Sequence, residues 1–347
     1  MSGPASRHTT IRDDAPAALR AMLATDPTLL ASIELDEDLY EGVTGFSLAP
    51  DGAEAFLFIT GGEGQYTETT AQHLDIATGD ASWGSGIEVP LSARSAAYSP
   101  DGRWMALPQA QGGLLLWDRT LDDDPDELLL GHECQALTFH PDGRRLVVAT
   151  EDVSLIVWDL AQARAERVIP VRRSQILDVA FDPAGTLLFG ATQEGLCVWS
   201  VDDGELHFED REPAMIYTLA LTRDGSRVAS GTGDGRVVVW ELPALRRAAT
   251  LQGHTNEVPA VAFSPDGTLL ASGGYDGRIK IRSVESGREV ASIEVGRVLL
   301  AIDLDEDDDE EHADDDGEII SPTVRALVWD EHGLLAVTGD GGILRWT

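Results

Sequence analysis

The chain has 347 residues, of which 43% are hydrophobic, and a mean hydropathy of −0.11, values typical of a globular water-soluble protein. Its 25 basic and 61 acidic residues give a formal net charge of −36. Such a charge repels phosphate and anionic lipid and argues against nucleic-acid and membrane-surface partners. Apolar runs such as 298–302 are too short to span a membrane, and the N-terminus lacks the apolar core of a signal peptide, so we expect a cytoplasmic protein.

The basic residues are arginines with one exception, Lys280. This usage fits a high-GC genome or a salt-adapted proteome, and part of the acidity is then background rather than function. The two cysteines, Cys134 and Cys197, are too few for a disulfide framework. Both fall in strand-like segments, where we expect buried free thiols.

The first 27 residues form an N-terminal arm in which segment 13–27 predicts a short amphipathic helix. Asp14 is suited to cap it, while Leu19, Met22 and Leu23 share one face. Asp26 precedes a proline and ends the helix. We expect the helix to dock on the rim of the molecule, with a contact to a partner or a second copy as the alternative.

The remainder of the chain, 28–347, repeats one pattern, seen best in "VAFSPDGTLLASGGYDGRIKIR" at 261–282. A short alternating strand ends at a Pro-Asp-Gly turn, a second strand ends at an Asp-Gly turn, and a third strand follows. Further copies cover 46–79, 97–118, 137–159, 179–200, 219–241 and 327–346. The turn glycines fall at 52, 102, 143, 185, 225, 267 and 333. Most of their spacings match a four-stranded propeller blade of about 40–45 residues.

Two dipeptide pairs identify a resemblance. Gly131-His132 with Trp158-Asp159 resembles the WD-repeat β-propeller family, and Gly253-His254 marks a second blade of this kind. The resemblance covers roughly 28–347, in a chain that we expect to be bacterial. It implies an all-β fold, a seven-bladed β-propeller of four-stranded antiparallel blades. It says little about function, because the family hosts many roles.

The resemblance also implies a buried hydrogen-bonded network within a blade, formed by a His, a Ser or Thr, a turn Asp and a Trp. The matching sets are His132, Thr150, Asp152 and Trp158 in the third blade, and His254, Ser272 and Asp276 in the sixth. Arg282 stands where the second set requires Trp, so we expect that network to be incomplete or rearranged. Holding the blade together is the expected role of both sets, since a buried polar group needs a partner.

The last repeat stops after its third strand, and the missing outer strand must come from elsewhere. Segment "LASIEL" (30–35) closely resembles "VASIEV" (290–295), the outer strand of the sixth blade. We therefore expect residues 29–35 to pair with the final repeat and close the ring.

Segment 303–318, "DLDEDDDEEHADDDGE", is an acidic insert between blades six and seven. A calcium loop aligned on Gly317 would need acids where His312 and Thr323 stand, so no metal site is predicted. A solvated loop is the plainer interpretation. The alternative is an acidic flap that covers Arg94 and Arg325 until a partner arrives.

The family places the Pro-Asp-Gly turns on one face and the blade-to-blade connections on the other, where partners usually bind. Tyr and Arg are favoured contact residues at such surfaces. One residue from each blade precedes the innermost strand at the mouth of the channel. The resulting candidate contact set is Thr44, Arg94, Gln135, Leu177, Tyr217, Pro259 and Arg325.

No catalytic signature is present: "HECQA" (132–136) lacks the second His of a zinc-protease motif, and no Gly-x-Ser-x-Gly elbow occurs. We predict a non-enzymatic scaffold, without cofactor, metal or catalytic residues, that binds a protein or peptide, a basic one included. The sequence does not define the oligomeric state, although a monomer is favoured. One alternative is an acidic carrier or chaperone that holds a basic protein or peptide through 303–318. Another is a propeller hydrolase or lyase with an unrecognised site in the channel.

Overall fold

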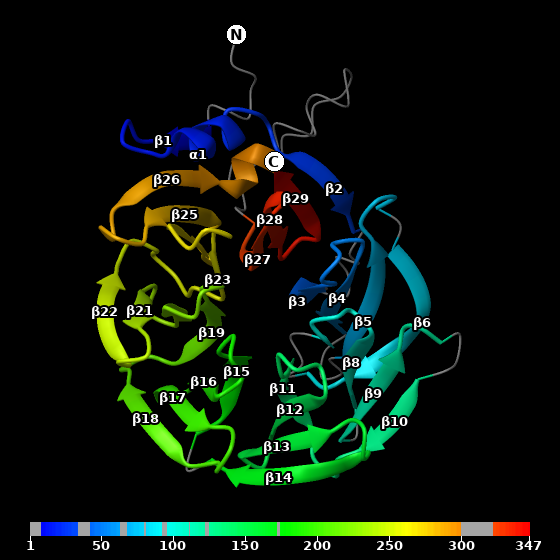
Figure 1. The fold of residues 1–347 in the computed structure, drawn as a ribbon. Coiled ribbons are helices and arrows are strands. Elements are labelled where there is room, and N and C mark those ends of the chain that lie inside the picture. The colour runs from blue at the N-terminus through cyan, green and yellow to red at the C-terminus, as the bar shows by residue number, and fades with distance from the viewer. Residues whose placement is uncertain are drawn as a thin grey trace.

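The computed structural model describes residues 8–33, 42–62, 68–79, 81–91, 96–110, 112–121, 125–171, 174–299 and 322–347. Their strands form seven antiparallel sheets arranged as blades around a central opening (Figure 1). The all-β seven-bladed propeller predicted from the repeats is confirmed. Blades one to six each take four consecutive strands, beginning with β3, β7, β11, β15, β19 and β23, and blade seven takes β27–β29 and β2.

The strands occupy four layers from the channel outward. The innermost strands are β3 (Gly42–Leu48), β7 (Ala97–Tyr98), β11 (Cys134–Phe139), β15 (Ile176–Phe181), β19 (Ile216–Leu221), β23 (Ala260–Phe263) and β27 (Val324–Asp330). The second layer comprises β4 (Glu54–Gly61), β8 (Trp104–Gln109), β12 (Arg145–Thr150), β16 (Leu187–Thr192), β20 (Arg227–Thr232), β24 (Leu269–Gly273) and β28 (Gly333–Thr338). The third layer comprises β5 (Glu68–Asp75), β9 (Gly113–Asp118), β13 (Ser154–Asp159), β17 (Gly195–Ser200), β21 (Val237–Glu241), β25 (Arg278–Ser283) and β29 (Gly342–Trp346). The outer strands are β6 (Ala81–Val89), β10 (Asp126–Leu129), β14 (Arg164–Pro170), β18 (Leu206–Arg211), β22 (Arg246–Leu251), β26 (Glu289–Glu294) and β2 (Thr28–Ser32).

The first two strands of a blade are joined by the turns that carry the predicted glycines. In blades one to six these glycines have φ between 67° and 71°, a left-handed conformation that glycine adopts without steric cost. Each of these six glycines donates its N–H to the carbonyl three residues earlier, as Gly267 does to Ser264 at 2.8 Å. The regular repeat of the chain therefore reflects one turn geometry used six times.

Apolar side chains packed between neighbouring sheets hold the ring together. One cluster joins blades three and four through Ile169, Ile176 and Trp199, and another joins blades four and five through Phe189 and Trp240. Most of these side chains are almost fully buried, which makes the hydrophobic effect the main stabilising term of the ring.

The ring closes as predicted, because β2 pairs antiparallel with β29 and supplies the outer strand of blade seven. The pairing runs from Thr28 opposite Arg345 to Ser32 opposite Gly342, and Ile33 continues it by donating its N–H to the Gly341 carbonyl at 3.2 Å. The strand thus begins one residue before the expected span of 29–35. Residues 34 and 35 lie outside the described part of the chain.

The N-terminal arm contributes a further strand that the sequence analysis missed. Strand β1 (Thr9–Ile11) pairs antiparallel with β26 and makes blade six five-stranded. Helix α1 (Ala17–Met22) follows it and lies outside β26 (Figure 1). Leu19 and Leu23 are buried in the core of blades six and seven, so the helix docks on the rim as expected.

The cap of that helix differs from the prediction. Its N-cap is Pro16 and no side chain caps the helix. Asp14 instead lies 3.4 Å from Arg288, on the hairpin before β26. The acidic side chain therefore ties the arm to the rim of the blade rather than to its own helix.

Several expectations fall outside the described residues, namely those for segment 303–318 and for Arg94. Where the chain is described, no helix is long and apolar enough to cross a membrane. Cys134 is buried and Cys197 is half-buried, and both are free thiols. The prediction of buried thiols is thus confirmed fully for Cys134 and in part for Cys197, which lies near the rim.

Candidate partner-binding face

The candidate contact residues share one structural feature, a bulge at the start of the innermost strand. In five blades the register against the second strand skips one residue, and the skipped residue belongs to the predicted set. These bulged residues are Thr44, Gln135, Leu177, Tyr217 and Arg325. A bulge removes its residue from the ladder and redirects the side chain. The same distortion in five blades therefore presents five different side chains in equivalent places around the channel.

A repeated backbone hydrogen bond fixes these positions relative to the turn between the second and third strands. Gly233 donates its N–H to the Met215 carbonyl at 2.9 Å, two residues before Tyr217. Tyr275 donates in the same way to Glu257 at 2.9 Å, two residues before Pro259. Blades three, four and seven repeat this bond. Pro259 is thus equivalent to the bulged residues, and all six lie at the end of the propeller opposite the glycine turns.

Arg325 is the most elaborately placed member of the set. Its guanidinium lies over the ring of Tyr275, 4.4 Å from the ring centroid, and its Nη1 donates to the Tyr275 hydroxyl. The contact combines cation–π attraction with a hydrogen bond. Arg325 Nε is buried, and within the described ranges it has no hydrogen-bond partner. Tyr275 was not among the predicted residues, although its position in an Asp-Gly turn of the same face could have indicated it.

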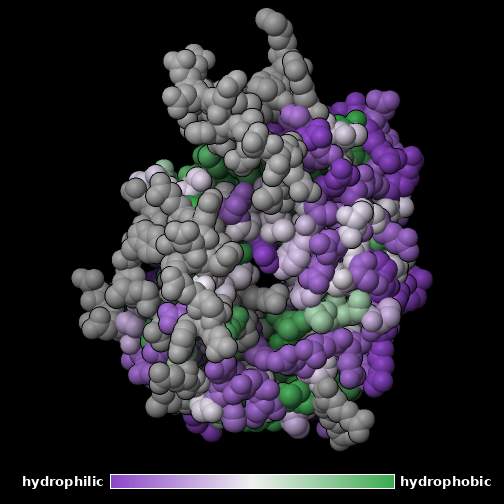
Figure 2. All heavy atoms as spheres, turned by 180° about the vertical axis from the view of Figure 1, so that it is seen from behind, coloured by the Kyte–Doolittle hydropathy of each residue, from purple (hydrophilic) through white to green (hydrophobic). Residues whose placement is uncertain are grey.

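The other members present a mixed surface. Gln135 is 8% exposed, and no described residue forms a hydrogen bond with its Oε1. Thr44 donates to the Phe58 carbonyl at 3.2 Å. Leu177, Tyr217 and Pro259 are half-buried. Hydrophilic side chains predominate on the face turned away from the viewer in Figure 1, with hydrophobic ones beside the central opening (Figure 2).

The sixth blade contains a closed polar network behind this face. His254 Nδ1 lies 3.0 Å from Asp276 Oδ1, and His254 Nε2 lies 2.9 Å from Ser272 Oγ. Arg282, at the position of the family's Trp, donates from Nη1 to Ser272 Oγ at 3.1 Å and from Nη2 to the Gln252 carbonyl at 3.0 Å. A neutral imidazole protonated on Nδ1 satisfies every member of this chain. The expected rearrangement is therefore a substitution in which Arg282 completes the network.

Burial shapes the ionisation of this network. Burial opposes the charge on Asp276, but hydrogen bonds from His254, Thr255 and Arg278 outweigh it and hold the pKa of Asp276 below its usual value. Burial lowers the pKa of Arg282, while Glu289 and Asp276 act in the opposite direction. An Asp that stays ionised next to an imidazole gives the strongest hydrogen bond of this kind.

The third blade does not form the equivalent chain, although it carries the full family set. Its His132 lies 3.5 Å from Asp152, and the two side chains are 46% and 40% exposed. Thr150 donates to Asp152 but pairs across the sheet with Ser154, near the turn. The strand register places Val148, not Thr150, where the sixth blade has Ser272, because Leu146 faces Trp158 as Leu270 faces Arg282. No hydroxyl of this blade therefore links its histidine to the tryptophan.

The Ser272–His254–Asp276 chain has the order of a hydrolytic triad. Ser272 and the side chain of His254 are 0% exposed, and Arg282 already occupies the serine hydroxyl. A substrate has no access to this oxygen, so the arrangement can only join the strands of the blade. Among the residues described, no group of three or more His, Cys, Asp or Glu side chains is placed to hold a metal ion.

Comparisons with known proteins agree with this architecture. The family model "WD domain, G-beta repeat" matches residues 126–159, 206–241 and 246–283. The β-propeller domain of Cps50 (Swd1) from Myceliophteria thermophila has a similar fold, with a TM-score of 0.65 over 92% of this chain and 100% of that chain at 16% identity. Identity this low supports the fold alone.

Curated relatives are similarly distant. A guanine nucleotide-binding protein subunit beta-1 from Caenorhabditis briggsae is 26% identical over 143 residues, which is 39% of this chain and 42% of the relative. A protein LST8 homolog from Drosophila melanogaster is 24% identical over 157 residues, which is 42% of this chain and 50% of the relative. The match thus spans half or less of these relatives, and the expectation of a bacterial source stays a prediction. With seven closed blades and three segments that match the repeat model, the chain belongs to the WD-repeat β-propeller family.

Proposed function

We propose that the protein is a non-catalytic scaffold that binds a protein or peptide partner at the channel mouth formed by the bulged residues. WD-repeat propellers typically serve as protein-interaction scaffolds, and the three matched segments support this general role. The observation that carries the specific proposal is the pair of unsatisfied polar atoms in the candidate set, Gln135 Oε1 and Arg325 Nε.

A buried polar atom without a partner destabilises the folded state by about 1–3 kcal/mol. Gln135 Oε1 accepts, and Arg325 Nε donates, so the two atoms need opposite partners. A polypeptide main chain supplies both an N–H and a carbonyl oxygen. Tyr217 and Tyr275 add large rigid rings of the kind that contribute most at interfaces. This combination of orphaned polar atoms and aromatic rings supports a protein or peptide as the ligand.

Quantitative affinity capture from cells of the source organism tests the proposal. Arg325→Ala and Tyr217→Ala are compared with wild type and with Arg223→Ala, whose side chain is 59% exposed at the opposite end of the propeller. We expect the amount of partner recovered with Arg325→Ala or with Tyr217→Ala to be about tenfold or more below the amount recovered with the wild type. Arg223→Ala should retain them fully. Equal recovery with all variants would exclude this face as the binding site.

A further inference from the structure

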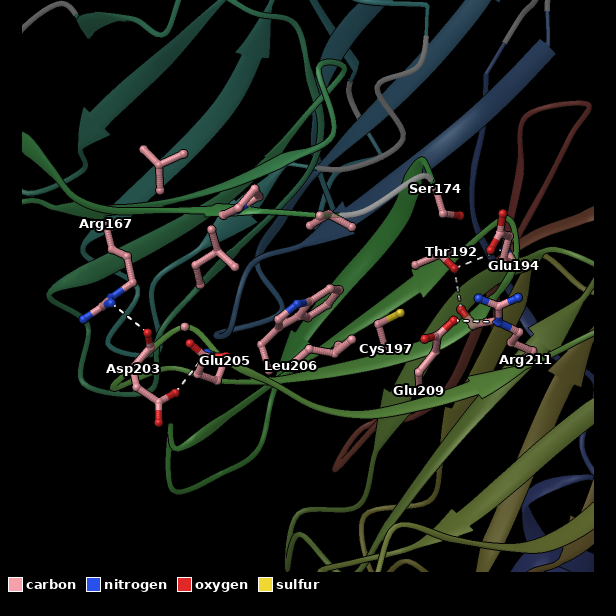
Figure 3. A pocket seen from close by; sticks show the side chains of 17 residues that line it. Arg167, Ser174, Thr192, Glu194, Cys197, Asp203, Glu205, Leu206, Glu209 and Arg211 are labelled. Carbon is pink, nitrogen blue, oxygen red and sulfur yellow. Dashed lines mark hydrogen bonds and ion pairs between the residues drawn. The ribbon is translucent and has the colours of Figure 1, made fainter.

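A groove on the rim, between blades three and four, has the features of a second binding site. It is a cavity of about 720 Å³ lined by the outer strand β14 of blade three and by β17 and β18 of blade four. Ser174, Thr192, Glu194 and Arg211 lie at one end, and Arg167 and Asp203 lie at the other, with Cys197 between them (Figure 3). Its volume falls within the range of ligand pockets in proteins, roughly 300–1,000 Å³.

Blade four carries small residues at two positions near the groove where other blades carry larger polar side chains. Ser174 stands two residues before the first paired residue of β15, the place that His132 holds before β11. Gly190 stands where blade six has Ser272, because Leu188 faces Trp199 as Leu270 faces Arg282. A Cβ at Gly190 would lie 2.7 Å from Trp199 Cζ3, so the indole packs directly on this glycine.

Ser174 is also an unsatisfied polar residue. It is 6% exposed, lines the groove, and its hydroxyl has no hydrogen-bond partner among the residues that the structure describes. Native proteins rarely leave such a group unpaired, and each exception needs an explanation. A ligand in the groove would supply the missing partner.

Apolar side chains line the groove between Ser174 and the end that carries Arg167 and Asp203. Val168 and Leu206 are 56% and 48% exposed, which is unusual for large hydrophobic side chains, and both line the groove. Trp199 and Ile169 continue the apolar lining inward. Two exposed hydrophobic residues at the lip of one cavity, one from each blade, form an anchor point for an apolar side chain.

The charges in the lining favour a basic ligand. Arg167 donates hydrogen bonds to the carbonyls of Asp202 and Asp203 at 2.8 Å each, and Arg211 donates to the Glu209 carboxylate at 2.8 Å. Within the described chain, no ion pair closer than 4 Å involves Glu194 or Glu205, although Glu194 acts electrostatically on Arg211 and helps to raise its pKa. A cationic side chain near Ser174 would therefore meet Glu194.

We propose that this groove binds a short extended peptide with an apolar side chain at Val168 and Leu206, a basic side chain at Glu194, and a main-chain hydrogen bond to Ser174. The distance along β17 from Trp199 to Gly195 is four residues, roughly 13 Å, which corresponds to four to five residues of an extended ligand. The site is on the outer rim and shares no residue with the channel-mouth set.

Fluorescence anisotropy with labelled peptides tests the proposal. The probes are Leu-Ala-Leu-Ala-Arg, the same sequence in reverse order, and both sequences with Glu in place of Arg. We expect one of the Arg probes to bind more tightly than its Glu counterpart. Leu206→Asp should weaken that binding about tenfold, and Glu194→Gln about threefold. Leu121→Asp, which alters a 57% exposed leucine after β9, is the matched control and should leave binding unchanged.

Ser174→Ala gives a second, independent readout. Removal of an unsatisfied hydroxyl should raise the melting temperature of the protein while it lowers the affinity for the Arg probe. If the serine were purely structural, its removal would change the melting temperature and the affinity in the same direction. Cys197 reports occupancy in the unmodified protein. Burial raises the pKa of its thiol to about 12, so its alkylation by iodoacetamide is followed by mass spectrometry in alkaline buffer, where bound peptide should slow it. Cys134 is 0% exposed and serves as the unreactive internal reference.

The proposal is overturned if neither Arg probe binds, or if the Glu probes bind as well as the Arg probes. Binding that Leu206→Asp and Leu121→Asp weaken equally would also overturn it. Concentration-dependent self-association that Leu206→Asp abolishes would assign the groove to a second copy of the chain instead.

Discussion

The two ends of the propeller differ in how much they vary from blade to blade. At one end, six glycine turns share one φ value to within a few degrees and the same hydrogen bond three residues back. At the other end, the bulged positions carry Thr44, Gln135, Leu177, Tyr217 and Arg325, which have no chemistry in common. Uniform positions serve the fold that every blade shares, and varied positions are free to serve a partner. The comparison supports the proposal that a partner is recognised at the channel mouth of the bulged end.

Some residues at the bulged end nevertheless stabilise the fold. The histidines of the sixth and third blades show how much stability such residues contribute. His254→Ala leaves Asp276, Ser272 and Arg282 buried with missing partners, so we expect a loss of about 2–4 kcal/mol in the free energy of unfolding. His132→Ala removes only a half-exposed pair and should cost about 0.5 kcal/mol or less. Chemical denaturation of both variants measures the difference.

Equal losses for the two histidines would contradict this part of the account. They would show that the family residues of the third blade act as a network despite their 3.5 Å separation and exposure. Partner capture by His132→Ala should match the wild type, because this residue lies outside the proposed contact set.

For the end with the glycine turns we predict a smaller effect on stability, which appears at low pH. Hydrogen bonds from Thr222 and Ser226 lower the pKa of Asp224 to about 2. The folded pKa lies below the unfolded value of about 3.9, so this carboxylate stabilises the fold fully above pH 4 and progressively less as the pH falls towards 2. The difference in unfolding free energy between wild type and Asp224→Asn should therefore be constant from pH 7 to 5 and vanish near pH 2.

That difference is expected to be smaller than the His254 effect, because Asp224 is exposed and its interactions are screened by solvent. A difference that grows as the pH falls would show that the carboxylate is not stabilised in the folded state. The other carboxylates of this acidic protein also titrate as the pH falls. Their contribution is the same in wild type and in Asp224→Asn, so it cancels when the two unfolding free energies are subtracted.

Much of the architecture could be predicted because it depends on local chemistry. The glycines at 52 to 267 require the same backbone conformation, and that requirement is visible as a repeated Pro-Asp-Gly or its variants. The likeness of 30–35 to 290–295 indicated the closing strand, since both segments pair with the third strand of a blade. Each of these features is visible in a segment of a few residues.

The features that were missed depend on register or on a neighbouring blade. Thr150 and Ser272 look equivalent in the sequence. The strand pairing shifts the match by two positions, so that Val148, not Thr150, holds the position of Ser272. Strand β1 has three residues and no alternating pattern of its own, so only its pairing with β26 defines it. The rim groove combines Ser174 of blade four with a lip from blade three, and a contact between two blades is not visible in either repeat alone.

Hydrogen–deuterium exchange of the protein, alone and bound to a captured partner, tests the central claim most directly. Exchange reports local opening of the backbone, so a bound partner slows it where it lies. We predict added protection at 215–217, 257–259 and 323–325, at the channel mouth, with no change at the turns of Gly225 and Gly267. Protection confined to those glycine turns, with none at the starts of the innermost strands, would contradict the account.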